Sequence, residues 1–493
     1  MSALPLSTAL YGTDAVRRID AAAIRGGVAG YTLMTRAAQA AFALLRDTWP
    51  DARRITVVCG LGNNGGDGCV LARLAQEAAL GVQLVALPGE PPAGSDAAQA
   101  RADWLASGDT IIETDSARLP PGDVVVDALF GIGLSRAPQG AAAALIEAIN
   151  AQGAPVLALD VPSGVDADSG HVPGAAVNAT VTISFIAHKR GLHSGAALDH
   201  VGRLELADLG VDAAAFAGID PAASLVRAEA LALLPGRRIN AHKGSHGHVL
   251  AIGGDHGGGG AIRLCAEAAL RTGAGLVSVF TRADHVAPLL GGRPECMVHA
   301  CESGMPEAPA ARASVLAIGP GLGRGDWGRA LLERFIDDPR PLVLDADALN
   351  LLARSPRLLH ARRILTPHPG EAARLLDVDI ATIQRDRCAS AAELATRYAA
   401  TIVLKGAGSV IAAPGIRPII IGAGNPGMAS GGMGDVLTGV IAALLAQGLD
   451  DFDAAWLGAL LHAVAGDRAA AAGGQRGLLA SDLFPYLRGD ADD

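Results

Sequence analysis

Residues Gly422 to Asp435 read GAGNPGMASGGMGD and place six glycines in thirteen residues directly ahead of one acidic residue. Glycine lets backbone N–H groups close around a ligand because no Cβ restricts φ. A strand-like run precedes this segment, and the apolar residues Val436 to Leu445 after it have the composition of a helix. We therefore predict that the loop ends at a helix N-terminus, where free amides and the helix dipole attract a phosphate. A flexible linker is the alternative interpretation.

Asp435 follows the last glycine of this segment. A carboxylate beside a bound phosphate can accept the proton of a substrate hydroxyl during phosphoryl transfer. We therefore predict that Asp435 is a catalytic base.

The composition limits the class of protein. A chain of 493 residues is too long for one ordinary core, so at least two domains are expected. No apolar run is long enough to span a bilayer, and the first residues lack the pattern of a secretion signal. The six cysteines form no CxxC pair, which indicates reduced thiols in the cytoplasm. A net charge of −10 and only 3% aromatic residues argue against nucleic-acid binding.

Lysine is rare in this chain. Only Lys189, Lys243 and Lys405 occur among 40 basic residues, so arginine supplies nearly all of the positive charge. A surviving lysine therefore indicates a place that needs a compact ammonium group, with chance retention as the alternative.

The first part of the chain has the pattern of a βαβ unit followed by further strands. We predict a glycine loop over Gly60 to Gly68 and a helix over Val70 to Ala79. The predicted strands are Arg54–Cys59, Val82–Leu87, Val124–Asp127, Val156–Asp160 and Thr180–Ile186. The strands that end at Asp127 and Asp160 place acids at strand carboxyl ends, where open parallel sheets bind ligands.

A looser segment separates this part from a second α/β series. We place the domain boundary near residue 223, giving domains 1–222 and 223–493. Predicted strands of the second series are His248–Ile252, Leu276–Phe280, Val315–Ile318, Pro341–Leu344, Arg363–Leu365 and Thr401–Leu404. Predicted helices include Ala261–Leu270 and Leu457–Ala472.

The first glycine loop has the spacing of a dinucleotide-binding fold but lacks two of its supporting features. Gly60, Gly62 and Gly65 match GxGxxG. The acid that would hold a ribose after the next strand is missing, and no GK[ST] follows. The side-chain oxygens of the loop instead suit a hard cation or a ribose phosphate.

Three motifs resemble the NAD(P)HX epimerase domain, also called the YjeF N-terminal domain: GLGNNGGDG, DALFGIGLS (Asp127 to Ser135) and ALDVPSGVDADSG (Ala158 to Gly170). The resemblance covers residues 10 to 220 and implies a Rossmann-like three-layer sandwich. It implies that Asp160 is a catalytic acid or base that also contacts the hydrated cofactor. Potassium would be held by Asn64, Asp127 and Ser163. The other implied cofactor contacts are Asn63, Asn64, Gly65, Gly66, Asp67, Gly131, Ile132, Gly133, Leu134, Ser135, Arg136 and Ala137.

An alternative for Asp127 and Asp160 is that both form turns or helix caps. The early segment TLMTRAAQA departs from the family, which more often has an acidic residue after LM.

The second part resembles the ADP- or ATP-dependent NAD(P)HX dehydratase, a branch of the ribokinase-like three-layer fold. The resemblance rests on the glycine-rich segment Gly422 to Asp435 and on five further motifs. These are KGSHGHVLAIGGDHGGGGA, GPGLG (Gly319 to Gly323), DADALN (Asp345 to Asn350), TPHPGE (Thr366 to Glu371) and LKGAGS (Leu404 to Ser409). It implies that the hydrated cofactor contacts Ala261, Gly321, Gly323, His368 and Asp435. The adenine nucleotide would contact Lys405, Gly406, Ala407, Gly408, Ser409 and Gly434.

Glu371, at a helix start, is a candidate for binding magnesium through water. His368 has a turn residue as its alternative role. The segment DHGGGGA departs from the family because it lacks a larger residue between its glycines.

Together the resemblances imply a two-domain repair enzyme. One domain epimerises NADHX and NADPHX at C6, and the other dehydrates the S epimer with ADP or ATP as phosphoryl donor. We also expect a cytoplasmic homo-oligomer that binds neither membrane nor nucleic acid. A ribokinase-like small-molecule kinase is the main alternative, as is a first domain that has become a non-catalytic binding module.

Overall fold

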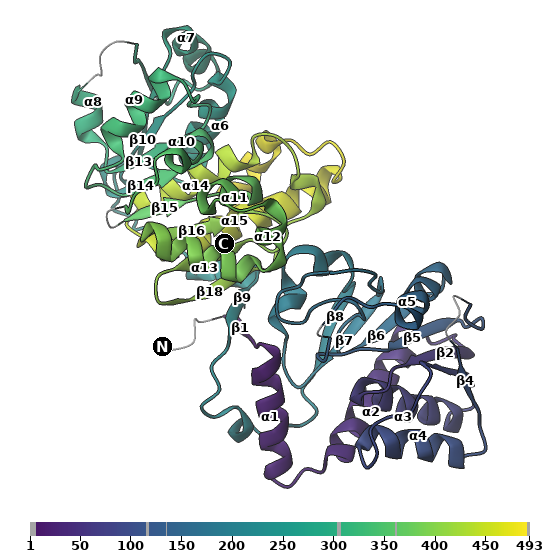
Figure 1. Cartoon of the computed structure of the whole chain (residues 1–493). Helices are drawn as coiled ribbons and strands as arrows, with labels where there is room; N and C mark the ends of the chain where they lie inside the picture. Colours follow the sequence, from purple (N-terminus) through teal and green to yellow (C-terminus); the bar gives the residue numbers. More distant parts are fainter. Residues whose placement is uncertain (1–5, 115–117, 135, 303–306, 360–361, 491–493) are drawn as a thin grey trace. The chain divides into compact units, whose positions relative to one another are not determined.

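The computed structural model describes residues 6–114, 118–134, 136–302, 307–359 and 362–490 (Figure 1). Its contacts divide the chain into two compact units. The N-terminal unit is Ala9–Ala223, and the C-terminal unit is Ser224–Asp493 together with Met1–Thr8. The contact division falls between Ala223 and Ser224, and Ser7 and Thr8 group with the C-terminal unit. The domain bounds 1–222 and 223–493 stay a prediction.

The N-terminal unit alternates helices and strands along the chain. Its elements are α1 (Thr13–Arg25), α2 (Gly30–Thr48), β2 (Arg54–Cys59), α3 (Asn63–Glu77), β3 (Gly81–Ala86), α4 (Asp96–Ala106), β4 (Ile111–Glu113), β5 (Val124–Ala128), α5 (Ala141–Ala151), β6 (Val156–Leu159), β7 (Val181–Phe185) and β8 (Arg203–Ala207).

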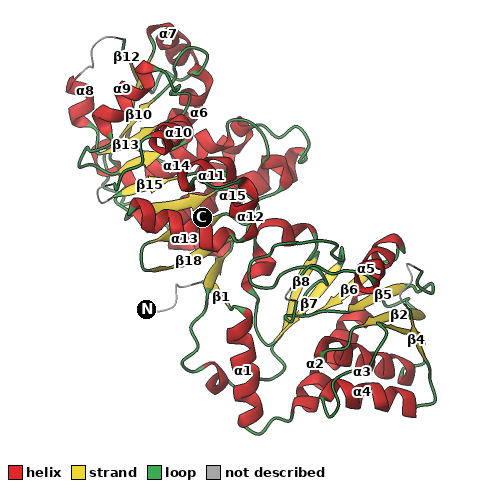
Figure 2. Ribbon diagram, viewed as in Figure 1, coloured by secondary structure: helices red, strands yellow, loops and turns green. Residues whose placement is uncertain are grey.

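These strands form one parallel sheet in the order β4-β3-β2-β5-β6-β7-β8. All residues of the central strands β5, β6 and β7 are buried, so both faces of the sheet are covered. Figure 2 shows helices flanking these strands. The parallel arrangement brings the carboxyl ends of β2, β5 and β6 to one edge of the sheet.

The C-terminal unit contains the longer series. Its elements are β1 (Ser7–Leu10), β9 (Ala223–Val226), β10 (His248–Ile252), α6 (Gly259–Arg271), β11 (Leu276–Thr281), α7 (Ala283–Gly292), β12 (Met297–Ala300), α8 (Glu307–Arg312), β13 (Val315–Ile318), α9 (Asp326–Phe335), β14 (Leu342–Leu344), α10 (Ala346–Arg354), β15 (Arg363–Leu365), α11 (Pro369–Leu376), α12 (Ile380–Arg385), α13 (Arg387–Tyr398), β16 (Thr401–Leu404), β17 (Val410–Ala413), β18 (Ile416–Ile421), α14 (Met433–Ala446), α15 (Asp451–Gly473) and α16 (Phe484–Asp490).

The sheet has the order β1-β9-β18-β17-β16-β15-β14-β13-β10-β11-β12. Strands β1 and β9 include residues from both sides of the division and are counted here with the sheet that they join. Strands β10 to β16 pair in parallel, whereas β17 pairs antiparallel with both of its neighbours. Apolar side chains on one face of the central strands share a core with α6, α14 and α15. The strands β10, β13, β14 and β16 are buried along their whole length, so helices cover both faces. The expected class, two α/β three-layer domains, is confirmed.

Five predicted strands have the same bounds in the structure: β2, β10, β13, β15 and β16. The predicted loop Gly60 to Gly68 is wrong, because α3 already begins at Asn63. Glycine has low helix propensity, but Gly65 lies where a Cβ would be 2.0 Å from the backbone oxygen of Gly60. Close packing of the helix start therefore explains the glycines that suggested a loop.

Helices α6 and α14 pack closely at Gly439. A Cβ at this position would lie 2.1 Å from the backbone oxygen of Cys265 on α6. The absence of a side chain thus lets the two helix backbones approach each other.

We expect Gly439→Ala to lower the free energy of unfolding by about 1–3 kcal/mol, the usual cost of overpacking. Denaturant unfolding of the full chain measures this. Gly291→Ala in α7 is the matched control, since a Cβ there meets no atom within 4 Å, and it should be neutral or slightly stabilising. Equal effects of the two substitutions would contradict this account of the α6 and α14 contact.

Candidate active sites

The N-terminal unit has a cavity of about 580 Å³ at the carboxyl edge of its sheet. Segments that follow β2, β5 and β6 line it. The expected site residues in the lining are Asn63, Asn64, Asp67, Gly131, Ile132, Gly133 and Asp160. The structure therefore brings all three epimerase-like motifs to one concave surface.

Asp160 follows β6 with a left-handed backbone, at a φ of 65°. Its carboxylate accepts hydrogen bonds from the Lys189 ammonium and, at 3.3 Å, from the Phe185 backbone N–H. Lys189 is 1% exposed and also donates to the Phe185 carbonyl at 2.7 Å. These contacts fix the position of the Asp160 carboxylate at the wall of the cavity.

Asn64, Asp127 and Ser163 are all buried; Asn64 also lines the cavity, whereas Asp127 and Ser163 do not. The Asp127 carboxylate accepts hydrogen bonds from Ser163 Oγ at 2.6 Å, from Ser163 N at 2.8 Å and from Leu129 N at 3.2 Å. Burial raises the pKa of Asp127 to about 6, although these hydrogen bonds act in the opposite direction. Both polar atoms of the Asn64 side chain lack a hydrogen-bond partner among the described residues. Among the described residues, no cationic side chain lies beside the Asp127 carboxylate. This buried carboxylate and the unpartnered amide of Asn64 fit a bound monovalent cation.

Asp67 is a second buried carboxyl in the cavity wall. Burial and the nearby charge of Asp160 raise the pKa of Asp67 well above its usual value. The raised pKa of Asp67 favours its neutral form, which can donate a hydrogen bond into the cavity.

The remaining expected residues of this site differ in position. Gly65, Gly66, Leu134, Arg136 and Ala137 do not line the cavity, and Ser135 lies outside the described residues. A Cβ on Gly66 would lie 2.6 Å from the Met34 side chain on α2, so this glycine serves helix packing.

The candidate site of the C-terminal unit centres on Lys405, which follows β16. Its Nζ lies 2.7 Å from Asp345 Oδ1 and 3.8 Å from Glu371 Oε2. The Thr438 hydroxyl on α14 donates to the other Asp345 oxygen at 2.9 Å. Burial alone would raise the pKa of Asp345. The charge of Lys405 and the hydrogen bonds from Lys405 and Thr438 outweigh burial, so the pKa of Asp345 is lowered.

Asp435 lies in the first turn of α14, as predicted from the glycine-rich segment. Burial raises the pKa of Asp435 to about 7, and the negative charge of Asp345 adds to the increase. Lys405 acts in the opposite direction. A pKa near 7 is suited to a general base because the group is both available and basic enough at neutral pH.

His368 and Glu371 form a capping box at the start of α11. Glu371 Oε2 accepts from the His368 backbone N–H at 2.8 Å, and His368 Nδ1 accepts from Gly370 N at 3.0 Å. Burial and the nearby Lys405 charge lower the pKa of His368, which favours the neutral ring. His368 therefore does help to form the turn that starts α11. Its half-exposed side chain also lies beside Glu371, which is close to Lys405.

Four of the glycines expected at this site have a positive φ, which other residues rarely adopt. Gly321 and Gly323 have φ values of 59° and 71° in the turn after β13. Gly406 and Gly408 have φ values of 142° and 61° in the turn after β16, where Ser409 Oγ donates to the Gly406 carbonyl at 3.0 Å. Ala261 lies in the first turn of α6, and Gly434 lies where a Cβ would be 3.0 Å from Lys405 Nζ. Gly434 therefore leaves the ammonium open to a ligand.

Two family models match the chain: "YjeF-related protein N-terminus" over residues 30–191 and "NAD(P)H-hydrate dehydratase" over residues 249–488. The bifunctional NAD(P)H-hydrate repair enzyme Nnr of Coxiella burnetii is 47% identical over 483 residues, which cover 98% of this chain and 99% of the relative. Its Escherichia coli counterpart is 48% identical over 482 residues, which cover 98% and 93%.

The chain belongs to the family of bifunctional NAD(P)H-hydrate repair enzymes. The expected enzyme class, an epimerase joined to a dehydratase, is confirmed by the match of both repair-family domains. A crystal structure of a ribokinase-like superfamily protein from Enterococcus faecalis is 29% identical with a TM-score of 0.50, covering 55% of this chain and 96% of that chain. It supports the ribokinase-like fold of the C-terminal unit.

Several residues in the two sites were missing from the predicted set. Lys189 supplies the buried partner of Asp160, and Asp20 and Asp96 add carboxylates to the first cavity. Asp345, the first residue of the DADALN motif, supplies the buried partner of Lys405. The rarity of lysine in this chain was the sequence signal that could have identified Lys189 as a site residue. Within the described ranges, no group of three or more His, Cys, Asp or Glu side chains has the arrangement of a metal site. A search of the same ranges finds no helix with the length and apolarity required to cross a membrane.

The raised pKa of Asp435 predicts a pH-dependent gain in stability for Asp435→Asn. Below the unfolded pKa, near 4, the wild-type carboxyl is neutral in both states. Between about 4 and 7 only the unfolded state loses the proton, so wild-type stability falls as pH rises. Relative to wild type, the variant should therefore gain stability between pH 5 and pH 8 by at most about 3 kcal/mol, because about two pKa units at ~1.4 kcal/mol each separate pH 5 from the raised pKa of about 7. Thermal unfolding at the two pH values measures this, and a difference independent of pH would contradict a buried, raised Asp435.

Proposed function

We propose that this chain repairs hydrated NADH and NADPH in two steps, one in each unit. The N-terminal unit interconverts the R and S epimers, and the C-terminal unit dehydrates the S epimer with a nucleoside phosphate as donor. The observation that carries the second step is Asp435, a partly buried carboxyl with a raised pKa at a helix N-terminus beside the Lys405 ammonium. Family membership over both units favours this reaction over the small-molecule kinase and the binding-module alternatives.

In the dehydratase step, Asp435 takes the proton of the C6 hydroxyl as the hydroxyl oxygen bonds to the terminal phosphorus of the donor. The bond from that phosphorus to the bridging oxygen breaks, and AMP leaves from ADP or ADP leaves from ATP. Lys405 and the free amides at the start of α14 stabilise negative charge on the phosphoryl group. The ring nitrogen lone pair then breaks the C6–O bond and releases phosphate, and loss of a C5 proton restores the dihydropyridine. Phosphate is a better leaving group than hydroxide, which is why the donor drives dehydration.

The nucleotide is proposed to bind at Lys405, Gly406, Ala407, Gly408, Ser409 and Gly434. These residues join an exposed glycine turn after β16 to the start of α14, and the buried Lys405 offsets phosphate charge. Both ADP and ATP are candidate donors. Magnesium would neutralise phosphate charge when bound. Because Glu371 already accepts from the His368 N–H, we assign Glu371 to contact magnesium through water instead of directly.

In the epimerase step, Asp160 is proposed to exchange a proton with the hydrated ring. Lys189 is a positioning residue, since it reaches the Asp160 carboxylate and the Phe185 carbonyl at once. Asp67, with its raised pKa, would donate a hydrogen bond to the substrate as a neutral acid. Asn63 and Gly131 to Gly133 would contact the rest of the cofactor at the cavity wall.

Potassium is proposed to bind at Asn64, Asp127 and Ser163. The amide, carboxylate and hydroxyl oxygens there match a hard cation, and the ion would supply the positive charge that Asp127 lacks. A cytoplasmic location is supported by the six cysteines, which are all buried and form no disulfide within the described part of the chain. A homo-oligomer stays a prediction.

The division of labour predicts opposite effects of two substitutions. Asp435→Ala should lower dehydration by about 10²-fold or more and leave epimerisation intact, since general acid–base catalysis contributes about 10²–10⁴-fold. Asp160→Ala should do the reverse. Chromatographic separation of R and S epimers measures one activity, and recovery of NADH absorbance from pure S epimer measures the other.

Asp326→Ala is the matched control, because Asp326 also lies in the first turn of a helix but is exposed. It should change neither activity. Loss of both activities in either catalytic variant, with folding intact, would refute the separate roles of the two units.

Potassium should raise the thermal unfolding temperature of the N-terminal unit in wild type, because binding to the folded state alone is stabilising. Asn64→Leu should abolish this potassium-dependent shift, as should Asp127→Asn. Lithium at equal ionic strength is the reference for non-specific salt effects. Identical unfolding temperatures in potassium and lithium for the wild type would contradict the proposed site.

A further inference from the structure

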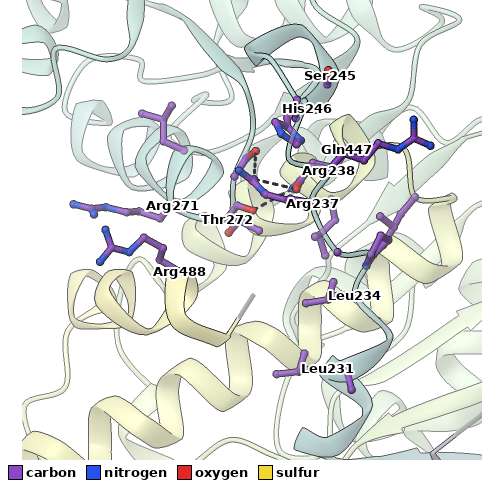
Figure 3. Close-up of a pocket in the computed structure, with 18 of the residues that line it drawn as sticks. Leu231, Leu234, Arg237, Arg238, Ser245, His246, Arg271, Thr272, Gln447 and Arg488 are labelled. Carbon is purple, nitrogen blue, oxygen red and sulfur yellow. Dashed lines mark hydrogen bonds between the residues drawn. The ribbon is translucent and has the colours of Figure 1, made fainter. Parts of the chain in front are cut away.

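Helix α6 is fixed at its C-terminal end. Arg237 donates to the Gly273 carbonyl at 2.7 Å, and Gln447, just beyond α14, donates to the Thr272 carbonyl at 3.1 Å (Figure 3). These contacts satisfy carbonyl groups at the end of α6 and join it to the end of α14. The opposite end of α6 begins within four consecutive glycines, residues 257–260. The start of α6 therefore needs contacts from outside the helix to take one defined position.

Two glycine-containing segments meet at the start of α6, one after β10 and one after β13. Asp255 N donates to the Gly321 carbonyl at 2.6 Å, and Gly254 N donates to the Pro320 carbonyl at 3.0 Å. A Cβ on Gly258 would lie 2.6 Å from the Gly321 backbone oxygen, so the two backbones are in close contact. The position of one segment thus determines the position of the other. Three residues expected to contact the hydrated cofactor lie on them: Ala261, Gly321 and Gly323.

Asp255 lies at the junction of the two segments. Its carbonyl accepts from Gly258 N at 2.7 Å, which closes the turn before α6. A Cβ on Gly323 would lie 2.5 Å from Asp255 Oδ2, so the carboxylate occupies the space that a side chain at position 323 would need. Arg282, directly after β11, donates from Nε to Asp255 Oδ1 at 2.8 Å. A third segment therefore holds the carboxylate in place.

Arg282 is itself held by several contacts. Its Nη1 donates to Glu302 Oε2 at 2.7 Å, and its guanidinium carbon lies 4.5 Å from the ring centroid of Trp327. The other Glu302 oxygen accepts from the Ala283 N–H at 2.9 Å. The side chains of Arg282 and Asp255 are 16% and 23% exposed, so water screens this pair less than a fully exposed one. The planar fork of arginine is suited to hold two carboxylates at once.

We propose that Asp255 and Arg282 are positioning residues for the hydrated dinucleotide in the dehydratase site. The pair holds the two segments against each other and so sets the shape of the wall that the expected substrate contacts form. This explains how DHGGGGA keeps a defined shape without a larger residue between its glycines. The inference rests on the proposed dehydratase reaction. It concerns the substrate alone, since the phosphoryl donor is expected at the turn after β16.

Steady-state dehydration of S-NADHX by the full chain, with a nucleotide donor, gives the first test. Arg282→Met and Asp255→Ala should each raise the KM for S-NADHX about tenfold, the scale of one lost hydrogen bond to a charged group. The KM for the nucleotide should stay unchanged. Because the two residues act as a pair, the double variant should have the same KM as the more affected single variant. Arg282→Lys keeps the charge but not the fork, so it should raise the KM less than Arg282→Met.

Arg362→Met is the matched control. It removes another ion pair of the C-terminal unit, with Asp451 at 3.2 Å, and lies directly before β15 instead of after a strand. It should change neither KM. Circular dichroism and thermal unfolding verify that each variant is folded.

Hydrogen exchange of the free protein tests the positioning role without the reaction. Peptides that cover residues 254–261 and 319–323 should exchange faster in Arg282→Met than in wild type, whereas peptides from α14 should exchange at the same rate. Unchanged exchange in the two segments would overturn the proposal. Equal increases in the KM for S-NADHX and for the nucleotide would also overturn it, as would additive effects in the double variant.

Failure of the proposed function has a different signature. In that case wild-type protein would not dehydrate S-NADHX with either nucleotide, and the exchange rates would still decide whether Asp255 and Arg282 hold the two segments.

Discussion

A buried lysine–aspartate pair lies at the carboxyl ends of the strands in each unit. Lys189 and Asp160 are 1% and 13% exposed, and Lys405 and Asp345 are 18% and 2% exposed. Loss of one partner from such a pair leaves an uncompensated charge, at a cost of about 3–5 kcal/mol. Each pair also adjusts its neighbours, because Asp160 raises the pKa of Asp67 and Asp345 raises that of Asp435. The same burial that makes these pairs necessary therefore creates carboxyl groups that hold a proton near neutral pH.

Much of the architecture follows from sequence pattern. Short apolar runs that end in an acid or a glycine mark the buried parallel strands, and the glycine-rich segment before Asp435 does end at a helix N-terminus. The family resemblance is carried by ordered motifs and is confirmed over nearly the whole chain. The loop predicted over Gly60 to Gly68 shows the limit of local reasoning. Glycine has low helix propensity, but here its missing side chain lets α3 begin directly against the strand end.

Features that depend on distant residues were not accessible from sequence. Asp160 and Lys189 are separated by 29 residues and Asp345 and Lys405 by 60, so no spacing rule joins them. Strands β1 and β9 were missed because they are short, and their place beside β18 depends on distant pairing.

The central claim is that two buried carboxyl sites on one chain complete a single repair reaction. The most direct test follows the return of dihydronicotinamide absorbance from a mixture of R- and S-NADHX with the full chain, magnesium, potassium and either ADP or ATP. The account predicts recovery of the whole mixture, faster than spontaneous epimerisation and dependent on the nucleotide. Recovery that stops at the S fraction would contradict the epimerase role of the N-terminal unit, and no recovery with either nucleotide would contradict the dehydratase role of Asp435.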